Sequence, residues 1–368
     1  MRLLILGIII LILVSCRDFV GRFGAPGQLL GGSIQGQELD LAWYVATLAG
    51  VAGAPGSSNG AGSAARFDGP TDITTDGQFL FVADRFNHTI RRIEISTGYV
   101  STLAGLAGVS GSADGVGTAA RFDNPRGITT DGVNLYVSDS ADTIRKIVIA
   151  TTETTTLAGT AGLTGTADGT GPAAEFDWPE GITTDGTYLY VIDRNNHTIR
   201  RIVIATAEVT TIAGTPGVPG GSDGFGVAAQ FDLPEGITTD GESLFIADNN
   251  NHTIRKLDLS TGFVSTFAGL AGVSGSANGI GAAARFDDPR GVTTDGIYLY
   301  VGDKDNNTIR RIDIATAEVK TFAGSPGASG STDALGTAAR FNEPEGITTD
   351  GEFLYVVDQG NHTIRIIR

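Results

Sequence analysis

The feature that most constrains this chain is a repeat of about 55 residues. A glycine that ends a β-rich run recurs at steps of 55, 54, 55, 55 and 55 residues, at Gly50, Gly105, Gly159, Gly214, Gly269 and Gly324. An Asp-Gly turn recurs in register with it, ending at Gly77, Gly132, Gly186, Gly241, Gly296 and Gly351. A fixed period of this length indicates a fold built from adjacent copies of one small unit.

Residues 231–269 show the unit clearly. Four runs rich in β-branched and aromatic residues, 236–239, 244–247, 253–259 and 263–267, are separated by turn-forming residues such as Asp-Gly and Ser-Thr-Gly. Four such strands predict one antiparallel sheet, which cannot bury both of its faces alone. Six copies therefore predict an all-β fold, a six-bladed β-propeller of four-stranded antiparallel blades.

The two ends of the repeat region are complementary. The last unit stops at Arg368 without a fourth strand, whereas residues 43–48 resemble a fourth strand and precede the first complete unit. We expect this N-terminal strand to complete the last blade and close the ring, because closure leaves few open sheet edges. Burial of Trp43 or Tyr44 is expected to stabilise the closure.

The motif within each unit identifies a family. F-x-x-P-x-G-I-T-T-D-G, followed by L-Y-V-x-D and then N-H-T-I-R, resembles the NHL repeat, with six matches across residues 43–368. The resemblance implies a six-bladed propeller. It implies no single activity, because the family includes protein binders, RNA binders, extracellular modules and some enzymes.

The N-terminal residues predict export. The apolar run 3–14 follows Arg2 and is shorter than the roughly 20 residues that a membrane-spanning helix needs, as in a secretory signal peptide. Residues 13–16 (LVSC) resemble a bacterial lipobox, in which Cys16 is lipidated. We therefore predict a lipoprotein-type signal peptide at 1–16, a flexible glycine-rich tether at 17–42 and the propeller at 43–368.

These features predict a bacterial NHL-repeat lipoprotein, exported and lipid-anchored to the cell envelope. Arg17 after Cys16 is compatible with sorting to the outer membrane or the cell surface. Cys16 is the only cysteine, so no disulfide forms within the chain. The formal net charge of −16 disfavours nucleic acid as a partner, since phosphate contacts need a cationic surface. The expected partners are an envelope or extracellular protein, peptide or glycan, and the membrane through the lipid anchor. We expect a monomeric ring without a cofactor.

Several residue types recur once per repeat and are interpreted as structural. The phenylalanines that end the long inter-blade loops are expected core anchors: Phe67, Phe122, Phe176, Phe231, Phe286 and Phe341. The aspartates that end the second strands are expected to accept backbone N–H bonds from the following turn: Asp84, Asp139, Asp193, Asp248, Asp303 and Asp358. The third-strand arginines are expected to pair with carboxylates: Arg91, Arg145, Arg200, Arg255, Arg310 and Arg365.

All four histidines occupy one repeat position, at His88, His197, His252 and His362, with Asp142 and Asn307 in the other two repeats. Adjacent sheets pack about 10 Å apart, whereas two zinc ligands must each lie about 2.1 Å from the ion. Histidines on neighbouring blades are therefore poorly placed to share a metal, and no metal-binding residue is predicted.

The residue after each loop proline changes its charge from blade to blade, although the flanking Pro and Phe are constant. We predict that this position lines the mouth of the central channel, on the face that carries the long inter-blade loops. Its members are Thr71, Arg126, Glu180, Glu235, Arg290 and Glu345. We expect Arg126 and Arg290 to reach solvent. A rim of mixed sign favours specific polar recognition, and a solvated rim without a selected ligand is the alternative.

Two classes of function remain, besides a purely architectural role. The preferred hypothesis is a membrane-anchored binding scaffold that recognises a protein, peptide or glycan with its loop-rich face. The alternative is a metal-dependent hydrolase or lyase, with a cation in the channel bound by Glu180, Glu235 and Glu345, because hard cations need several oxygen ligands. Arg126 and Arg290 in the same ring argue against the cation. No single His, Ser or Cys interrupts the repeat as a catalytic residue would, so no catalytic residue is predicted.

Overall fold

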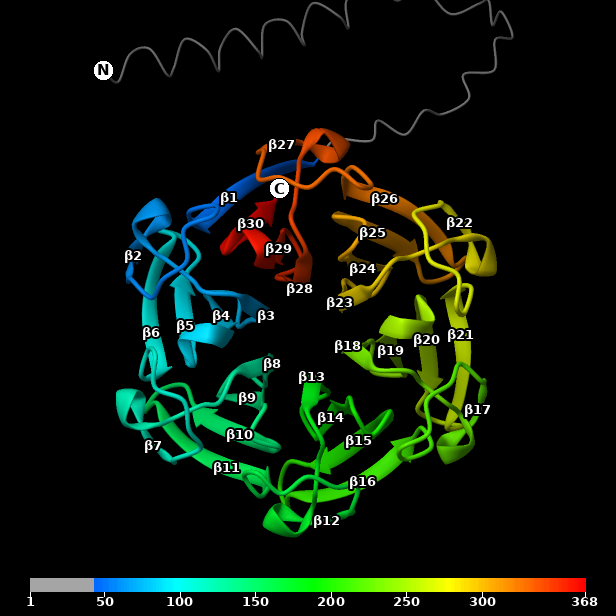
Figure 1. The fold of residues 1–368 in the computed structure, drawn as a ribbon, viewed down its shortest axis with the longest axis horizontal. Helices are drawn as coiled ribbons and strands as arrows, with labels where there is room; N and C mark the ends of the chain where they lie inside the picture. Colours follow the sequence, from blue (N-terminus) through cyan, green and yellow to red (C-terminus); the bar gives the residue numbers. More distant parts are fainter. Residues whose placement is uncertain (1–42) are drawn as a thin grey trace, which may run out of the picture. The chain divides into compact units, whose positions relative to one another are not determined.

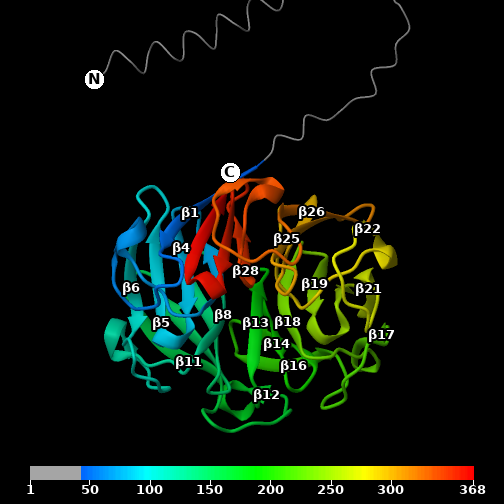
Figure 2. The same ribbon diagram turned by 45° about the horizontal axis from the view of Figure 1, so that its top comes forward.

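The computed structural model describes residues 43–368, which form six antiparallel sheets arranged around a central axis (Figure 1). Figure 2 shows the sheets standing side by side around this axis. The predicted signal peptide at 1–16, with Cys16, and the predicted tether at 17–42 lie outside the described residues. No helix within residues 43–368 is long and apolar enough to cross a membrane. The prediction of an all-β, six-bladed propeller is confirmed.

The first four strands of each sheet, counted from the channel outward, follow the predicted units. The innermost strands are β3 (Pro70–Thr75), β8 (Pro125–Thr130), β13 (Pro179–Thr184), β18 (Pro234–Thr239), β23 (Pro289–Thr294) and β28 (Pro344–Thr349). The second strands are β4 (Phe79–Asp84), β9 (Asn134–Asp139), β14 (Tyr188–Asp193), β19 (Ser243–Asp248), β24 (Tyr298–Asp303) and β29 (Leu354–Asp358). The third strands are β5 (Thr89–Glu94), β10 (Thr143–Val148), β15 (Thr198–Val203), β20 (Thr253–Asp258), β25 (Thr308–Asp313) and β30 (Thr363–Ile367). The fourth strands are β1 (Tyr44–Gly50), β6 (Tyr99–Gly105), β11 (Glu153–Gly159), β16 (Glu208–Ala213), β21 (Phe263–Gly269) and β26 (Glu318–Gly324).

Each sheet has a fifth strand, so the expected count of four is wrong. The inter-blade loop runs along the outer edge of the next blade before it crosses to the channel, and two of its residues pair with the fourth strand. In the first blade Gly60 pairs with Val100 and Ala61 with Tyr99. The fifth strands are β2 (Gly60–Ala61), β7 (Gly115–Val116), β12 (Gly169–Thr170), β17 (Gly224–Phe225), β22 (Gly279–Ile280) and β27 (Ala334–Leu335).

Single-turn 3₁₀ helices occur at two places in the repeat among the described residues. Those after the fifth strands are η2 (Gly62–Ala64), η4 (Gly117–Ala119), η5 (Gly171–Ala173), η6 (Gly226–Ala228), η8 (Gly281–Ala283) and η9 (Gly336–Ala338). Those after the second strands are η3 (Arg85–Asn87), η7 (Asn249–Asn251) and η10 (Gln359–Asn361). The second group contacts the inter-blade loops, since the N–H of Phe86 donates to Asp68 O over 3.0 Å. These turns and the inter-blade loops therefore share one face, as predicted.

Strand β1 lies between β27 and β30, in the sheet formed by the last repeat, and Figure 1 shows it in blue beside the red C-terminal strand. The backbones of Tyr44 and Arg368 exchange two hydrogen bonds of 2.8 and 3.0 Å. The expected burial of Trp43 or Tyr44 is wrong, because these side chains are 37% and 40% exposed. The alternation of the strand instead buries Val45 and Ala49.

The core consists of six apolar clusters, most of them formed between neighbouring sheets. All six loop phenylalanines are fully buried, as predicted. The guanidinium of Arg91 lies 5.3 Å from the ring centroid of Phe67 and donates to Asp84 Oδ2 over 2.7 Å. It also donates to the loop carbonyl of Arg66 over 2.9 Å. The buried arginines therefore hold the long loops against the blades, which confirms their predicted pairing with carboxylates.

The aspartates differ from expectation in one detail. Asp84 Oδ1 accepts the N–H of Asp68, over 2.8 Å, from the loop that precedes the innermost strand. The expected donor, a backbone N–H of the turn after the second strand, is satisfied within that turn, because the N–H of His88 donates to Arg85 O. All six aspartates make the loop bond. Asp139 alone among them also accepts a backbone N–H of the following turn, whereas the other five accept the side-chain amide of a turn asparagine.

Candidate functional site

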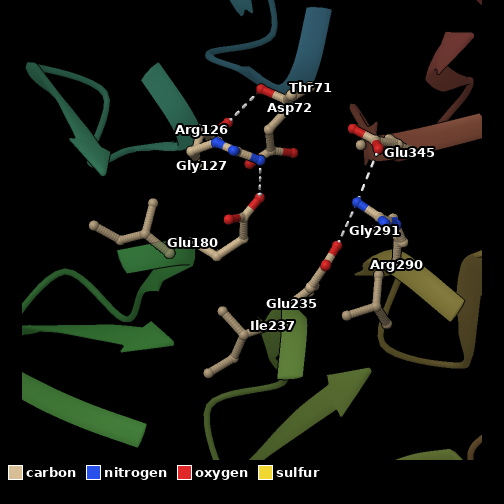
Figure 3. Close-up of a pocket in the computed structure, with 15 residues that line it drawn as sticks. Thr71, Asp72, Arg126, Gly127, Glu180, Glu235, Ile237, Arg290, Gly291 and Glu345 are labelled. Atoms are coloured by element: carbon tan, nitrogen blue, oxygen red, sulfur yellow. Dashed lines mark hydrogen bonds and ion pairs between the residues drawn. The ribbon is translucent and has the colours of Figure 1, made fainter. Parts of the chain in front are cut away.

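The six innermost strands bring the six predicted rim residues together around one central cavity (Figure 3). Its open volume is about 430 Å³, including the part that is continuous with solvent. Its polar and charged lining residues are Thr71, Asp72, Arg126, Glu180, Glu235, Arg290 and Glu345. The structure therefore brings all six predicted rim residues to one cavity.

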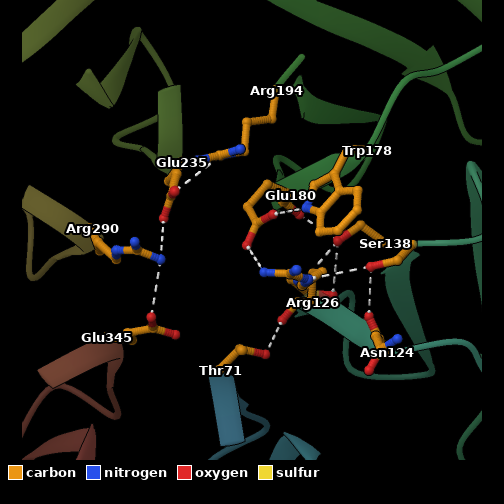
Figure 4. Close-up of polar contacts among 12 residues, drawn as sticks. Thr71, Asn124, Arg126, Ser138, Trp178, Glu180, Arg194, Glu235, Arg290 and Glu345 are labelled. Carbon is orange, nitrogen blue, oxygen red and sulfur yellow. Dashed lines mark hydrogen bonds and ion pairs between the residues drawn. The ribbon is translucent and has the colours of Figure 1, made fainter. Parts of the chain in front are cut away.

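The expectation that Arg126 and Arg290 reach solvent is wrong. The side chain of Arg126 is 7% exposed and that of Arg290 is 18% exposed. The neighbouring inner strands approach so closely that a Cβ on Gly127 or Gly236 would overlap a carbonyl oxygen of the next strand. Side chains from these strands therefore line a narrow channel and pair with one another across it (Figure 4).

One cluster joins the second and third blades. Arg126 Nη1 lies 3.1 Å from Glu180 Oε1, and its guanidinium stacks 4.7 Å from the ring centroid of Trp178. The indole N–H of Trp178 donates to Glu180 Oε2 over 3.1 Å. Arg126 Nε donates to Ser140 Oγ over 3.2 Å. The carboxylate of Glu180 is therefore held by a guanidinium and an indole.

A second cluster joins the third to sixth blades. Arg290 Nη1 lies 2.6 Å from Glu235 Oε2 and 3.0 Å from Glu345 Oε1. Arg194 Nε donates to Glu235 over 2.9 Å, and Gln359 donates to Glu345 over 2.7 Å. Burial raises the pKa of Glu345 to about 7, against the opposing effect of Arg290. Burial also raises the pKa of Glu235, which Arg290 again opposes. Removal of Arg290 would leave both carboxyls buried without their main counter-ion.

The sequence interpretation missed Asp72, which replaces a glycine found at this position in the other five blades: Gly127, Gly181, Gly236, Gly291 and Gly346. Its Oδ2 accepts the N–H of Ile128 from the next inner strand over 2.9 Å. Burial raises the pKa of Asp72 to about 7, which the backbone hydrogen bonds of Ile128 and Ile73 oppose. Alignment of the six repeats would have revealed this exception.

The sequence interpretation also missed two sets of residues at the mouth of the cavity. Each set lies next to a residue that recurs in the repeats, the loop proline or the second-strand aspartate. The first set precedes the loop proline and has φ between 47° and 58°, at Gly69, Asn124, Trp178, Leu233, Asp288 and Glu343. The second set follows the second-strand aspartate, at Arg85, Ser140, Arg194, Asn249, Lys304 and Gln359. Members of both sets contact the channel residues, because Asp288 and Lys304 lie 3.2 and 3.8 Å from Arg290 and Glu345. We call these two sets the mouth residues.

The signature histidines hold the first set in place. His197 Nδ1 accepts the backbone N–H of Leu233 in the next blade over 3.1 Å. Asp142 makes the same bond to Trp178 with a carboxylate oxygen over 3.0 Å. Burial lowers the pKa of His197, which favours the neutral imidazole that can accept this bond. The histidine position therefore has the structural role that its repetition predicted.

The cation hypothesis finds little support in this geometry. Glu180, Glu235 and Glu345 each engage a guanidinium. Within residues 43–368, no group of three His, Cys, Asp or Glu side chains is placed to hold a metal ion. The arrangement favours hydrogen bonding and charge pairing with a ligand over coordination of a cation.

Comparison with known proteins gives the following matches. The chain is 26% identical over 327 residues to NHL repeat-containing protein 2 from Homo sapiens, covering 85% of this chain and 40% of that protein. An auxiliary nutrient binding protein from Bacteroides thetaiotaomicron superimposes with a TM-score of 0.66 at 20% identity, over 89% of this chain and 76% of that chain. An inactive variant of virginiamycin B lyase from Staphylococcus aureus, with quinupristin, gives a TM-score of 0.54 at 15% identity, over 88% and 99% of the two chains. No family model matches the chain.

The fold and the cavity define a six-bladed β-propeller with a narrow, charged central channel. Three curated relatives, at 26–27% identity over 82–85% of this chain, are NHL repeat-containing proteins, which supports the predicted resemblance to the NHL-repeat family. The chain spans about 40% of the length of the first curated relatives that it matches. The likeness to the solved structures shows the fold alone.

Proposed function

We propose that this chain is an exported binding protein of the bacterial envelope, anchored through lipid on Cys16, whose loop-bearing face recognises a protein, peptide or glycan. The lipobox-like residues 13–16 support the anchor. The family supports a binding scaffold, and a neighbour in fold is named as an auxiliary nutrient binding protein. The ligand would bind at the mouth residues, above the charged cavity.

One observation carries the proposal: the bonds that hold the first set of mouth residues, those before the loop proline, repeat in every blade, whereas the side chains at these positions differ. A left-handed backbone costs roughly 1–2 kcal/mol for residues other than glycine. Gly69 avoids this cost, but Trp178, Leu233 and Glu343 occupy equivalent positions with φ of 58°, 47° and 55°. The left-handed backbone recurs in all six blades, and glycine would adopt it without strain, so the larger side chains at this position are not needed for the fold. Strained residues of this kind cluster at functional sites.

We further propose that strand β1 closes the ring and keeps the mouth rigid. A closed ring fixes the positions of six blades relative to one another, so the mouth residues are preorganised before a ligand arrives. The supporting contacts are the pairing of β1 with β30 and the hydrogen bonds of Thr47 to Asp333, of 3.0 and 3.1 Å.

The test is capture of a partner from envelope extract by the full-length protein, with bound material identified by mass spectrometry. Trp178→Gly and Leu233→Gly remove the mouth side chains and relieve backbone strain, so both variants should remain folded. We expect at least tenfold weaker capture by each variant. The matched control is Val133→Ala, which changes a 65% exposed residue in the β8–β9 turn on the opposite face. Unchanged capture by both glycine variants, or equal loss in the control, would contradict the proposal.

A further inference from the structure

Five cationic side chains gather at the channel, and four of them pair with carboxylates: Arg126, Arg194, Arg290 and Lys304. The fifth, Arg85, is half-buried and makes no side-chain hydrogen bond or ion pair within residues 43–368. Its Nε is buried, but neither of its Nη atoms is among the buried partnerless atoms. A charged donor without a protein acceptor forms its strongest hydrogen bonds with an anionic acceptor. Arg85 is therefore the cation at the mouth that an incoming anion can satisfy.

The surroundings of Arg85 suit a flat ligand. The guanidinium lies 4.5 Å from the ring centroid of Phe86, and Phe86 is 49% exposed. The ring of Phe86 lies over Gly69, because a Cβ on Gly69 would overlap it. The first blade thus has a half-exposed aromatic ring, held between Arg85 and Gly69, where the other five blades have the side chain that precedes the loop proline.

The charged groups of the channel also affect the pKa of Arg85. Burial lowers its pKa, Arg126 lowers it further, and Glu180 and Glu345 raise it. Arg126 is paired with Glu180, so the guanidinium of Arg85 supplies the one positive charge left for a ligand, which suits a singly charged anion. This balance fits a monoanion such as a carboxylate better than a phosphate.

We propose that Arg85 and Phe86 form a subsite for the carboxylate-bearing sugar of an acidic glycan. This inference rests on the proposed binding function. The guanidinium fork binds the carboxylate in a bidentate manner, and the apolar face of the sugar ring packs on Phe86. Trp178, which is 36% exposed and stacked with Arg126, offers a second aromatic surface for a neighbouring sugar. An aromatic wall with a few convergent polar groups is the usual composition of a small-ligand site.

The experiment measures binding to the full-length protein by titration calorimetry, with three probes. We expect a galacturonate trimer to bind at least tenfold more tightly than the uncharged galactose trimer and an alanine tripeptide. Equal binding of the galactose trimer would overturn the role of the carboxylate. Equal binding of the tripeptide would overturn the sugar in favour of a peptide carboxylate. No detectable binding of the galacturonate trimer would overturn the subsite.

Variants locate the binding. Arg85→Gln removes an unpaired charge and should leave the melting temperature unchanged while it weakens galacturonate binding at least tenfold. Arg85→Lys keeps the charge without the planar fork and should retain part of the affinity. The matched control is Arg92→Gln on β5, because Arg92 stacks 5.0 Å from the ring centroid of Phe79 outside the cavity. Galacturonate binding that is insensitive to Arg85→Gln would overturn the inference. Envelope capture that depends on Trp178, without galacturonate binding, would overturn this inference alone and leave the proposed function standing.

Discussion

His362 in the last repeat accepts, at Nδ1, a hydrogen bond from the backbone N–H of Gly69 in the first repeat, 3.0 Å away and 293 residues earlier in the chain. Every other pair of adjacent blades has an equivalent bond, with Asp142 and Asn307 replacing histidine in two of them. The φ of His362 is 56°, in the left-handed region that His, Asn and Asp tolerate better than most residues. The signature residue therefore links blades and positions the mouth of the channel.

The first prediction concerns this link. His362→Asn should change the free energy of unfolding by less than about 0.5 kcal/mol, because asparagine keeps an acceptor and tolerates the backbone. His362→Ala should lose about 2 kcal/mol, roughly half from the unpaired N–H and half from backbone strain. Urea unfolding of the two variants would measure the difference. An equal loss in both variants would show that the imidazole stabilises the ring by packing and not by accepting this bond.

Asp72 gives a prediction on pH. Burial raises its pKa in the folded protein to about 7 from an ordinary value of 3.8, so between these two values the folded state binds more protons than the unfolded state. Stability from this group is therefore present at low pH and falls as pH rises toward 7. Asp72→Asn keeps the acceptor for Ile128 but does not ionise. It should match the wild type near pH 4 and exceed it by roughly 1–3 kcal/mol at pH 8. The free energy of unfolding of both proteins would be measured from pH 4 to pH 8. A difference between them that does not change with pH would exclude the raised pKa.

The repeat pattern predicted the ring because its determinants lie within one unit. For example, a phenylalanine equivalent to Phe231 stands at the same sequence spacing before the innermost strand of each repeat, and all six are buried. The fifth strand could not be predicted in the same way. Gly224–Phe225 is a strand of two residues within a glycine-rich loop, too short to show alternation, and it exists only because β21 runs beside it.

The sequence predicted which residues lie at the channel, but not that their side chains are buried and paired with one another. Glu235 stands next to Pro234 at the start of the innermost strand, which placed it at the channel. Its pairing with Arg290 depends on how closely two strands from different repeats approach, and no pattern within one repeat reports that distance. Asp72 departs from a glycine that is constant in the other five blades, and Arg85 stands at a position that differs between blades, so comparison between repeats was the signal that would have found them.

Strand β1 gives a prediction on stability. Deletion of residues 43–48 should lower the melting temperature by roughly 10 °C or more, because it removes buried Val45 and the backbone bonds to β30. Deletion of residues 17–42 should leave the melting temperature within about 2 °C. Differential scanning calorimetry of the two deletions provides the comparison. Equal melting temperatures would contradict closure of the ring by β1.

The anchor is tested by Cys16→Ala. Without the thiol that carries the lipid, the protein should be found in the soluble fraction or as an unprocessed precursor. The wild type should partition into detergent after membrane isolation. Metabolic labelling with a fatty acid would report the modification directly. A Cys16→Ala protein that is cleaved normally and still partitions into membranes would rule out a lipid anchor at this residue.

The last prediction concerns Arg290. Replacement of an exposed rim residue would change stability little, whereas replacement of the buried Arg290 should destabilise the protein. Arg290→Glu should cost about 3–5 kcal/mol of stability at pH 8, because Glu235 and Glu345 lose their counter-ion and a third carboxylate is buried beside them. The matched control, Lys320→Glu on β26, alters a side chain that is 55% exposed and should cost less than about 1 kcal/mol. The loss in the Arg290 variant should shrink as pH falls from 8 to 5, since the pKa of Glu345 is already about 7 and protonation removes the repulsion. A loss that is small at pH 8, or that does not change with pH, would show that Arg290 does not hold these carboxylates in their ionised form.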